Sequence, residues 1–396
     1  MLIANDQTGL PVNLTEQRTP KEMAELKRRG GYICPQCQTP VILKAGPIKI
    51  PHFAHQRLSS CESFSEPESS RHLKGKIDLF HWFTQFYQTE LEAYLPEIRQ
   101  RPDVFLPALR AAIEFQCSAI SAEQFAKRSH SYLKNGYRPI WLFGGKEVKR
   151  KGSYYPLSPF LQLFFQFSPE FGLWFIRYCP DDESFTFYLQ ITPITPSLFH
   201  ASTLKVPLKH ASFPFLFQKP EAIHIPYTLH HWMKAKQRWL QQQMVFQTGR
   251  QHPFLQRVYA KGQNPFLLPT IVGLPVRLMA ILKNHPIEWQ FYLWEDIYSN
   301  GGVTSVNQGE TILQRRIKEN ILKRRYWPLV SENLLRMMVS DYFKLLVMVG
   351  IMRETKREEY TLLVNPVLSA TIYQQIKSEE EFCEIFGKQT IRRLIF

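Results

Sequence analysis

The 396-residue sequence predicts an α/β protein with a small N-terminal β module, a central mixed domain and a mainly helical C-terminal region. Three observations predict this organisation. Short apolar runs separated by Gly and Pro fill residues 1–62, helical and alternating patterns follow one another through 63–150, and helical spacing dominates 226–396. The chain is also too long for one ordinary core, which favours two or three domains.

The charge balance favours a polyanionic partner. Lys and Arg outnumber Asp and Glu by 49 to 34, a formal charge of +15, which favours nucleic acid before a membrane surface. We expect no small-molecule substrate. The first residues lack the basic and apolar segments of an export signal, so we expect a cytoplasmic protein. No stretch supplies the ~18 consecutive apolar residues of a spanning helix, so we expect no membrane span.

The N-terminal module contains three of the six cysteines, in a pattern that favours metal binding. Cys34 and Cys37 are two residues apart, so one tight turn brings both thiolates to one ion, and His52, His55 and Cys61 follow. We expect structural zinc on Cys34, Cys37, His55 and Cys61, because so small a core needs a bound metal to stabilise its fold. On a strand His52 and His55 point to opposite faces, which makes His52 the alternate ligand or a phosphate contact. Free cysteines with surface histidines are the other interpretation.

A helix is predicted to open the central domain after the segment 65–70, Ser-Glu-Pro-Glu-Ser-Ser. Helical spacing relates four apolar positions, Leu73, Ile77, Phe80 and Tyr87. Glu68 and His72 are four residues apart, so they share a face at the start of this helix.

A β-hairpin is predicted next, with strands from Arg101 to Leu106 and from Ala111 to Gln116 joined by Pro-Ala-Leu-Arg. Alternation places Glu114 and Gln116 on one face of the second strand. Asp103 lies on the first strand, so we expect its carboxylate to meet that of Glu114 across the hairpin edge.

A helix from Ala122 to Asn135 and a strand from Pro139 to Phe143 follow the hairpin. Ser121 and Gln124 have the spacing of a capping box, and Gly136 is placed as a C-terminal stop. The order of elements is therefore helix, hairpin, helix, strand.

An aromatic-rich region then reaches about residue 225. The runs 173–178 and 184–189 predict a second hairpin around a Pro-Asp-Asp turn. The central domain either ends near 150 or includes these strands.

The C-terminal region, 226–396, contains a segment at 310–365 that resembles a winged-helix module. A helix at 341–349, a charged turn at 353–359 and a short apolar run from Tyr360 follow one another there. A plain helical packing domain is the commoner explanation of such a pattern.

The stretch from His230 to Trp239 interleaves basic and aromatic residues and is the predicted DNA-contacting segment of this region. Lys234, Lys236 and Arg238 would release counterions from phosphates, and Trp239 offers a surface for base stacking. A solvated helix face is the alternative.

The acidic residues of the central domain favour a hard divalent cation. Glu68, Asp103 and Glu114 come from a helix and two neighbouring strands, and the carbonyl of Phe115 could add a further oxygen. Hydrolysis of a phosphodiester at neutral pH needs an ion that lowers the pKa of a bound water and neutralises charge on the phosphate. Hard oxygen ligands suit Mg²⁺, which binds through one or two carboxylates and keeps its waters.

Several ordered motifs carry a resemblance to a known family. They are Glu68-Ser-x-x-His72-x-Lys74, Arg101-Pro-Asp103-Val, Glu114-Phe-Gln116-x-Ser118 and Arg128-x-x-x-Tyr132, after Cys34-x-x-Cys37 and Pro51-His-Phe-Ala-His55. Together these resemble the CoiA family of bacterial competence proteins, whose nuclease-like domain is of the PD-(D/E)XK type. The resemblance implies a restriction-endonuclease-like core and a role in natural transformation. It also implies processing of incoming single-stranded DNA or of branched recombination intermediates, with the recombinase and other competence proteins as possible partners.

Carried over residue by residue, the resemblance makes Asp103 and Glu114 the ligands of Mg²⁺ or Mn²⁺ and Glu68 an acidic supplement. Gln116 occupies the usual lysine position, and its amide can orient water but carries no charge. Catalysis could then depend on His72, Lys74 or Lys76. Otherwise the protein is an accessory factor that binds DNA without cutting it. RNA binding, which rests on charge alone, ranks below both.

Arg128 and Tyr132 share one face of the second predicted helix. There they either grip a phosphate and stack a base, or anchor the helix to the sheet.

Overall fold

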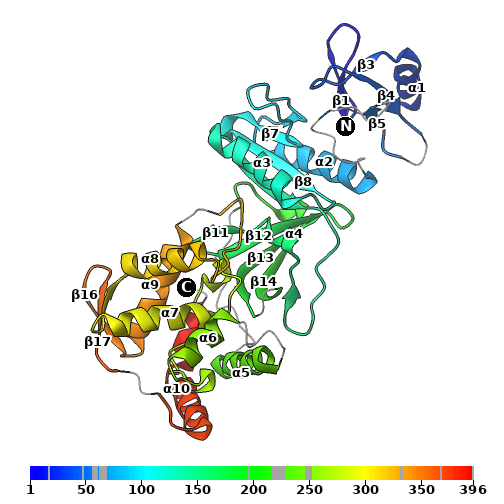
Figure 1. The fold of residues 1–396 in the computed structure, drawn as a ribbon. Helices are drawn as coiled ribbons and strands as arrows, with labels where there is room; N and C mark the ends of the chain where they lie inside the picture. Colours follow the sequence, from blue (N-terminus) through cyan, green and yellow to red (C-terminus); the bar gives the residue numbers. More distant parts are fainter. Residues whose placement is uncertain are drawn as a thin grey trace.

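A computed structural model describes residues 1–16, 18–46, 49–55, 61, 69–194, 197–215, 228–245, 252–330, 333–365 and 368–394. The molecule is elongated, and its three parts follow one another along its length (Figure 1). The N-terminal module lies at one end, a large sheet occupies the middle, and the helical C-terminal region forms the other end.

The N-terminal module is an antiparallel sheet of short strands in the order β2-β1-β3-β4-β5. The strands are β1 (Ile3–Asn5), β2 (Pro11–Asn13), β3 (Tyr32–Ile33), β4 (Pro40–Lys44) and β5 (His52–His55). Helix α1 (Pro20–Arg29) packs on β4 and starts with a complete capping box between Thr19 and Glu22. The core of the N-terminal module joins that of the central domain, since Tyr32 and Phe53 belong to the same buried cluster as Leu79 of the central domain.

Helix α2 (Ser70–Phe83) opens the central domain, capped by the Ser69 hydroxyl. The predicted apolar spacing extends too far, because the helix ends at Phe83 and Tyr87 lies beyond it. Gly75 allows the close approach of α2 to the sheet, since a Cβ there would lie 2.1 Å from a ring carbon of Phe115.

The central sheet contains nine strands among the described residues, in the order β10-β14-β13-β12-β9-β8-β7-β6 with β11 on β12. They are β6 (Glu90–Leu91), β7 (Val104–Leu106), β8 (Ala111–Gln116), β9 (Arg138–Phe143), β10 (Tyr155–Pro156), β11 (Gln166–Ser168), β12 (Gly172–Cys179), β13 (Ser184–Pro193) and β14 (Leu198–Pro207). The short helix α4 (Pro159–Gln162) precedes β11. One sheet therefore joins the segment before residue 150 to the aromatic-rich segment after it.

Both hairpins pair as predicted from the alternation of residues. Strands β7 and β8 are antiparallel around the 3₁₀ turn Pro107–Leu109, and β12 and β13 are antiparallel as well. The first strand is shorter than predicted and begins at Val104. Pro102, just before it, has no N–H with which to extend the ladder.

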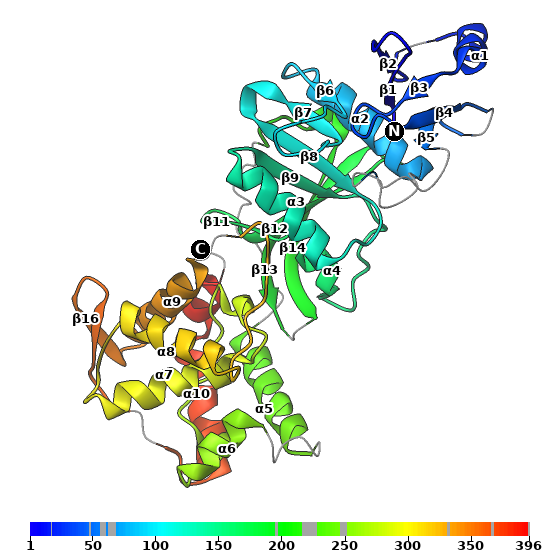
Figure 2. The same ribbon diagram turned by 45° about the horizontal axis from the view of Figure 1, so that its top comes forward.

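Helix α3 (Ala122–Lys134) connects β8 to β9, which run parallel, so the predicted order of helix, hairpin, helix and strand is present. Helices α2 and α3 lie on opposite faces of the hairpin (Figure 2). Ile113 and Phe115 join the cluster that includes Leu79 of α2, whereas Ala112 packs with Tyr132 of α3. The alternation of β8 therefore directs Glu114 towards α3.

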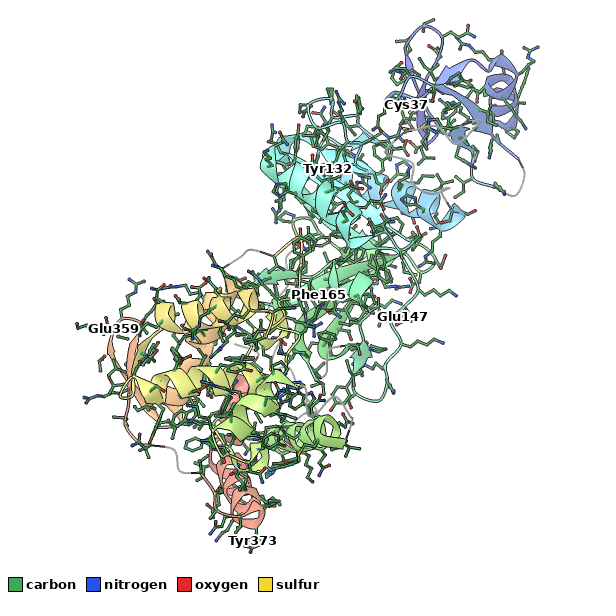
Figure 3. The ribbon with its side chains drawn as sticks, viewed as in Figure 1. Cys37, Tyr132, Glu147, Phe165, Glu359 and Tyr373 are labelled. Carbon is green, nitrogen blue, oxygen red and sulfur yellow. The ribbon has the colours of Figure 1, made fainter. Side chains whose placement is uncertain are left out.

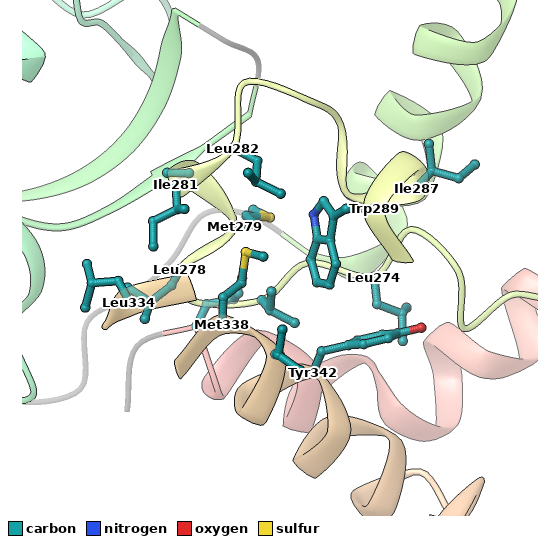
Figure 4. Packing of buried hydrophobic residues seen from close by; sticks show 14 of the residues in the cluster. Leu274, Leu278, Met279, Ile281, Leu282, Ile287, Trp289, Leu334, Met338 and Tyr342 are labelled. Atoms are coloured by element: carbon teal, nitrogen blue, oxygen red, sulfur yellow. The ribbon is translucent and has the colours of Figure 1, made fainter. Parts of the chain in front are cut away.

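The C-terminal region is mainly helical. Its helices are α5 (Leu229–Val245), α6 (Pro253–Ala260), α7 (Pro286–Ser299), α8 (Val306–Lys318), α9 (Leu334–Met348) and α10 (Ile372–Arg392). A small sheet of β15 (Val303–Ser305), β17 (Glu359–Leu362) and β16 (Met352–Lys356) has the order β15-β17-β16. Apolar side chains of α7, α9 and the preceding loop pack closely, among them Met279, Trp289, Met338 and Tyr342 (Figure 4). No helix of the described part of the chain is long and apolar enough to cross a membrane.

The segment predicted to resemble a winged helix contains helix α9 followed by the hairpin β16-β17. Most of α9 is buried, including Met338, Val339, Tyr342 and Phe343. A recognition helix must expose its side chains to a DNA groove, so α9 serves the core in this position.

Candidate functional site

Four predicted zinc ligands of the N-terminal module lie together. The ligand atoms of Cys34, Cys37, His55 and Cys61 all lie within 4.8 Å of one another. The Cys34 turn is closed by a 3.0 Å hydrogen bond from the Gln38 N–H to the Cys34 carbonyl. Three thiolates and one imidazole at this separation suit the closed tetrahedron of a structural zinc site.

The histidine of this cluster is His55 rather than the alternate His52. On β5 the two side chains point to opposite faces, as the strand period requires. Nδ1 of His52 lies 2.9 Å from the carbonyl of Ile50, whereas Nε2 of His55 lies 3.3 Å from Sγ of Cys37. Burial and the charge of Arg101 lower the pKa of His55, which favours the neutral imidazole that binds metals.

The module contacts the central domain on the side that carries this cluster, where Figure 3 labels Cys37. The Gln36 amide donates a 3.2 Å hydrogen bond to the Arg99 carbonyl. The N–H groups of Leu2 and Ile3 donate hydrogen bonds of 2.9 and 3.2 Å to Oε2 of Glu92. The position of the module therefore depends on a buried carboxylate of the central domain.

Asp103 lies just before β7 and is surrounded by donors. Its Oδ2 accepts a 2.8 Å hydrogen bond from the Phe115 N–H and lies 3.3 Å from Nε2 of His72, while Nζ of Lys76 is 3.6 Å from Oδ1. Burial alone would raise the pKa of Asp103, but His72, Lys76 and the Phe115 N–H together lower it well below its usual range. Asp103 is therefore a carboxylate at neutral pH.

Glu114 lies on β8, and α3 supplies its partners. Tyr132 donates a 2.6 Å hydrogen bond to Oε1, and the Arg128 guanidinium forms an ion pair with the same atom. Burial raises the pKa of Glu114 to about 7 against the opposing effect of Arg128, and the charge of Asp103 acts in the same direction as burial. The charge of Asp103 therefore reaches Glu114.

Lys76 is the least exposed cation of the site, since 1% of its surface is accessible. Besides Asp103, it pairs with Glu92, the carboxylate that anchors the N-terminal module. An ammonium group buried between two carboxylates stays charged because both compensate its loss of hydration.

The remaining residues of the predicted catalytic set are more distant or are not described. Glu68 lies outside the described residues. Gln116 donates a 2.9 Å hydrogen bond to the Ser118 carbonyl, so its amide serves the end of β8. Lys74 pairs with Asp78 and Glu183. Of the three predicted substitutes for the usual lysine, His72 and Lys76 thus contact Asp103.

The structure corrects one of the two predicted DNA contacts of α3. Tyr132, labelled in Figure 3, is fully buried and cannot stack a base, so it anchors α3 to the sheet. Arg128 pairs with Glu114 and lies over the Trp141 ring at 5.5 Å, but 31% of its side chain is exposed. A phosphate contact of Arg128 stays a prediction.

Only part of the predicted DNA-contacting segment on α5 is exposed to solvent. Lys236 is buried and lies 2.6 Å from Glu379, so it cannot reach a phosphate. Lys234 and Arg238 are exposed, and Trp239 is half-buried. Residues two apart on a helix lie on nearly opposite sides, which explains the difference.

Sequence reasoning missed Glu92. No motif surrounds Glu92. Its role arises because it pairs with Lys76 and accepts hydrogen bonds from the N–H groups of Leu2 and Ile3. A positive φ of 50° at this non-glycine residue marks the position in the structure but leaves no sequence signal.

Comparisons with known proteins cover nearly the whole chain. Residues 15–64, 68–221 and 227–373 match the family models of the N-terminal, nuclease-like and C-terminal domains of competence protein CoiA. Competence protein CoiA of Bacillus subtilis (strain 168) is 34% identical over 347 residues, which cover 85% of this chain and 91% of that protein. No solved structure matches the chain. The order of three matched domains and the identity over most of both proteins agree, and the chain belongs to the CoiA family of competence proteins.

Proposed function

We propose that this protein processes DNA during natural transformation, as a metal-dependent nuclease that acts on incoming single-stranded DNA or on recombination intermediates. The observation that carries the proposal is the environment of Asp103. It shares an electrostatic environment with Glu114, and His72 and Lys76 approach it from α2. Carboxylates from neighbouring strands with a cation beside them are the parts that phosphodiester hydrolysis requires.

Asp103 and Glu114 are the residues that would hold Mg²⁺ or Mn²⁺. Their hard carboxylate oxygens fit such an ion, which needs one or two protein carboxylates. When bound, the ion lowers the pKa of a water molecule and neutralises charge on the phosphate. His72 contacts Asp103 and Arg128 contacts Glu114, so both residues would be neighbours of the ion.

Lys76 compensates for glutamine at position 116 in this proposal. A lysine beside the reacting phosphate stabilises the charge that develops there, which the amide of Gln116 cannot do. Lys76 contacts the Asp103 carboxylate from α2, whereas a lysine at position 116 would lie on β8. The ion pair with Glu92 holds the Lys76 side chain in place.

A cleavage assay tests the nuclease. Labelled single-stranded, duplex and branched DNA are incubated with the purified protein and Mg²⁺ or Mn²⁺, and products are followed on gels. We expect Asp103→Asn and Glu114→Gln each to reduce cutting by at least about 100-fold. Asp182→Asn is the matched control, since it removes an exposed carboxylate of the same domain that pairs with Lys205. Cutting that survives both site variants would falsify the assignment.

A DNA-binding accessory factor without nuclease activity is the second candidate. It is favoured by one observation, the engagement of both carboxylates by His72, Lys76 and Arg128. If the wild-type protein binds DNA but cuts none of the substrates with either metal, the accessory function is the correct one.

A further inference from the structure

A cavity of about 690 Å³ lies where the central sheet meets the C-terminal helices. We call it the junction pocket. Its sheet residues, Tyr154, Pro193 and Leu198, come from the β10-β14-β13 side, whereas β7 and β8 lie near the opposite edge. Helix α5 lies beside the ends of β13 and β14 in both ribbon views (Figures 1 and 2). The volume of the junction pocket is typical of ligand sites, and the pocket is separate from the Asp103 site.

Three stacked aromatic rings form one wall of the junction pocket. The His285 ring lies between Trp232 and Trp239, with centroid distances of 5.5 and 4.7 Å and interplanar angles of 19° for both pairs. Burial lowers the pKa of His285 to about 3, and Lys236 adds to this effect, so the stack is neutral. Trp232 is buried and Trp239 is half-buried, so Trp239 is the member through which a further ring can join.

The charged side chains of the described lining are mainly cationic. The lining contains Arg238, Lys283, Lys323 and Arg325 and a single carboxyl group, that of Glu288. Glu288 accepts hydrogen bonds of 2.9 Å from the Asn284 amide and 2.7 Å from the His285 N–H, and burial raises its pKa to about 7. The pocket therefore favours an anion.

Two nitrogen atoms of the lining are buried without a hydrogen-bond partner among the described residues. They are Nε of Arg325 and Nδ1 of His252. Such groups are rare in native proteins because an unmet donor or acceptor is costly, so they indicate a ligand or ordered water.

We propose that the junction pocket binds a nucleotide of single-stranded DNA. The base stacks on the Trp239 side of the aromatic wall, and the adjoining phosphates contact Arg238, Lys283 and Lys323. The inference takes DNA as the partner in the proposed function, but it concerns a second site whose failure is measured separately from cleavage.

An exposed cation beyond the pocket, Lys234, favours a strand over a free nucleotide. Lys234 and Arg238 are one helical turn apart on α5, and both are exposed. Lys234 is not among the pocket residues, so it extends the basic surface away from the aromatic wall. Successive phosphates of one strand can contact such a row, whereas a single nucleotide fills the pocket alone.

Fluorescence anisotropy with a labelled oligothymidylate, in buffer without Mg²⁺, tests the proposal on the full-length protein. Lys283→Ala with Lys323→Ala should weaken binding about tenfold and reduce the magnitude of the slope of log K against log salt by about 1.4, since each lost contact to single-stranded DNA contributes ~0.7. The backbone contacts of these residues stay, so the fold should be retained. Trp239→Ala should weaken binding ~5- to 100-fold, and Trp239→Phe should recover most of the loss.

Exposed residues elsewhere in the C-terminal region provide matched controls. Lys356→Ala with Lys377→Ala removes one lysine of β16 and one of α10, and Tyr298→Ala removes an exposed aromatic ring of α7. Affinity for the oligonucleotide should stay within twofold of wild type in these controls. Equal affinity of the pocket variants and the controls would overturn the proposal.

Competition distinguishes a DNA strand from a free nucleotide. Thymidine monophosphate and ATP should displace the oligonucleotide weakly, at millimolar concentrations, because each occupies the pocket alone. The strand assignment is wrong if ATP binds wild type but not the pocket variants while those variants keep full oligonucleotide affinity. Binding is measured without Mg²⁺ and cleavage with it, so the junction pocket and the Asp103 site can fail independently.

Discussion

Tyr132 donates its hydroxyl to Oε1 of Glu114 across a distance of 2.6 Å, deep between α3 and the central sheet. The same oxygen receives the Arg128 guanidinium. A helix residue that resembles a DNA contact in the sequence thus holds a predicted metal ligand in position.

Tyr132→Phe keeps the buried ring and removes only this hydrogen bond. We expect a loss of about 1–3 kcal/mol in the free energy of unfolding, because a buried carboxyl group loses a donor. Urea unfolding measures it. Tyr137→Phe is the control, since its hydroxyl bonds the exposed Glu97 and its removal should cost less than about 0.5 kcal/mol. DNA affinity should not change with Tyr132→Phe, and a tenfold loss would restore this residue as a DNA contact.

Lys76 and Glu92 form a buried pair that links α2 to the N-terminal module. Lys76→Gln leaves the charge of Glu92 uncompensated, so we expect a loss of about 3–5 kcal/mol in stability. Lys76→Gln with Glu92→Gln removes both charges and should recover most of it. The double variant also tests catalysis in a folded protein, since cutting should stay low without the Lys76 ammonium group. Full cutting by a stable double variant would remove Lys76 from the catalytic set.

The local structure around the site was predictable because its signals are local. Alternation of Ile113, Glu114 and Phe115 gives the faces of β8, and the Ser121 hydroxyl caps α3 by accepting the Gln124 N–H. Asp103 and Glu114 lie on two segments of one hairpin, so their proximity follows from pairing alone.

The partners of these carboxylates come from distant elements, which sequence patterns do not relate. Glu92 acts through Lys76 and through the backbone of Leu2, 90 residues away. The composition of α5 likewise does not show which of its basic residues are exposed to solvent. The helical period alone would have separated Lys236 from Lys234 and Arg238, because a step of two residues turns a helix by about 200°.

The Cys34, Cys37, His55 and Cys61 cluster predicts one equivalent of zinc per chain. Metal analysis of the purified protein measures it. Cys34→Ser should lose the ion and the protease resistance of the N-terminal module, because so small a sheet depends on the metal for stability. Cys383→Ala, at a buried cysteine of α10 outside the cluster, should retain the zinc. Chelation that leaves the module folded would contradict a structural role.

Glu288 predicts a pH-dependent stability. Burial raises its pKa from 4.5 to about 7 against the hydrogen bonds of Asn284 and His285. The folded state therefore favours the protonated carboxyl. This contribution is fully present below the unfolded pKa, is lost as pH rises through about 7, and amounts to at most about 3 kcal/mol.

Glu288→Gln carries no proton to lose, so it should gain stability relative to wild type as the pH rises from 5 to 8. His252, 3.9 Å from Glu288, and His285 are present in both proteins, so the difference between the urea midpoints of the two proteins isolates the carboxyl group. Glu295→Gln on the same helix is the control. Burial would raise the pKa of Glu295, but Arg257 and Lys261 lower it, so its contribution is lost only as the pH falls below about 4.5. The stability difference between this variant and wild type should therefore stay nearly constant from pH 5 to 8. A parallel pH dependence for Glu288→Gln and wild type would mean that the buried carboxyl group is hydrated and ionises as it does in the unfolded chain.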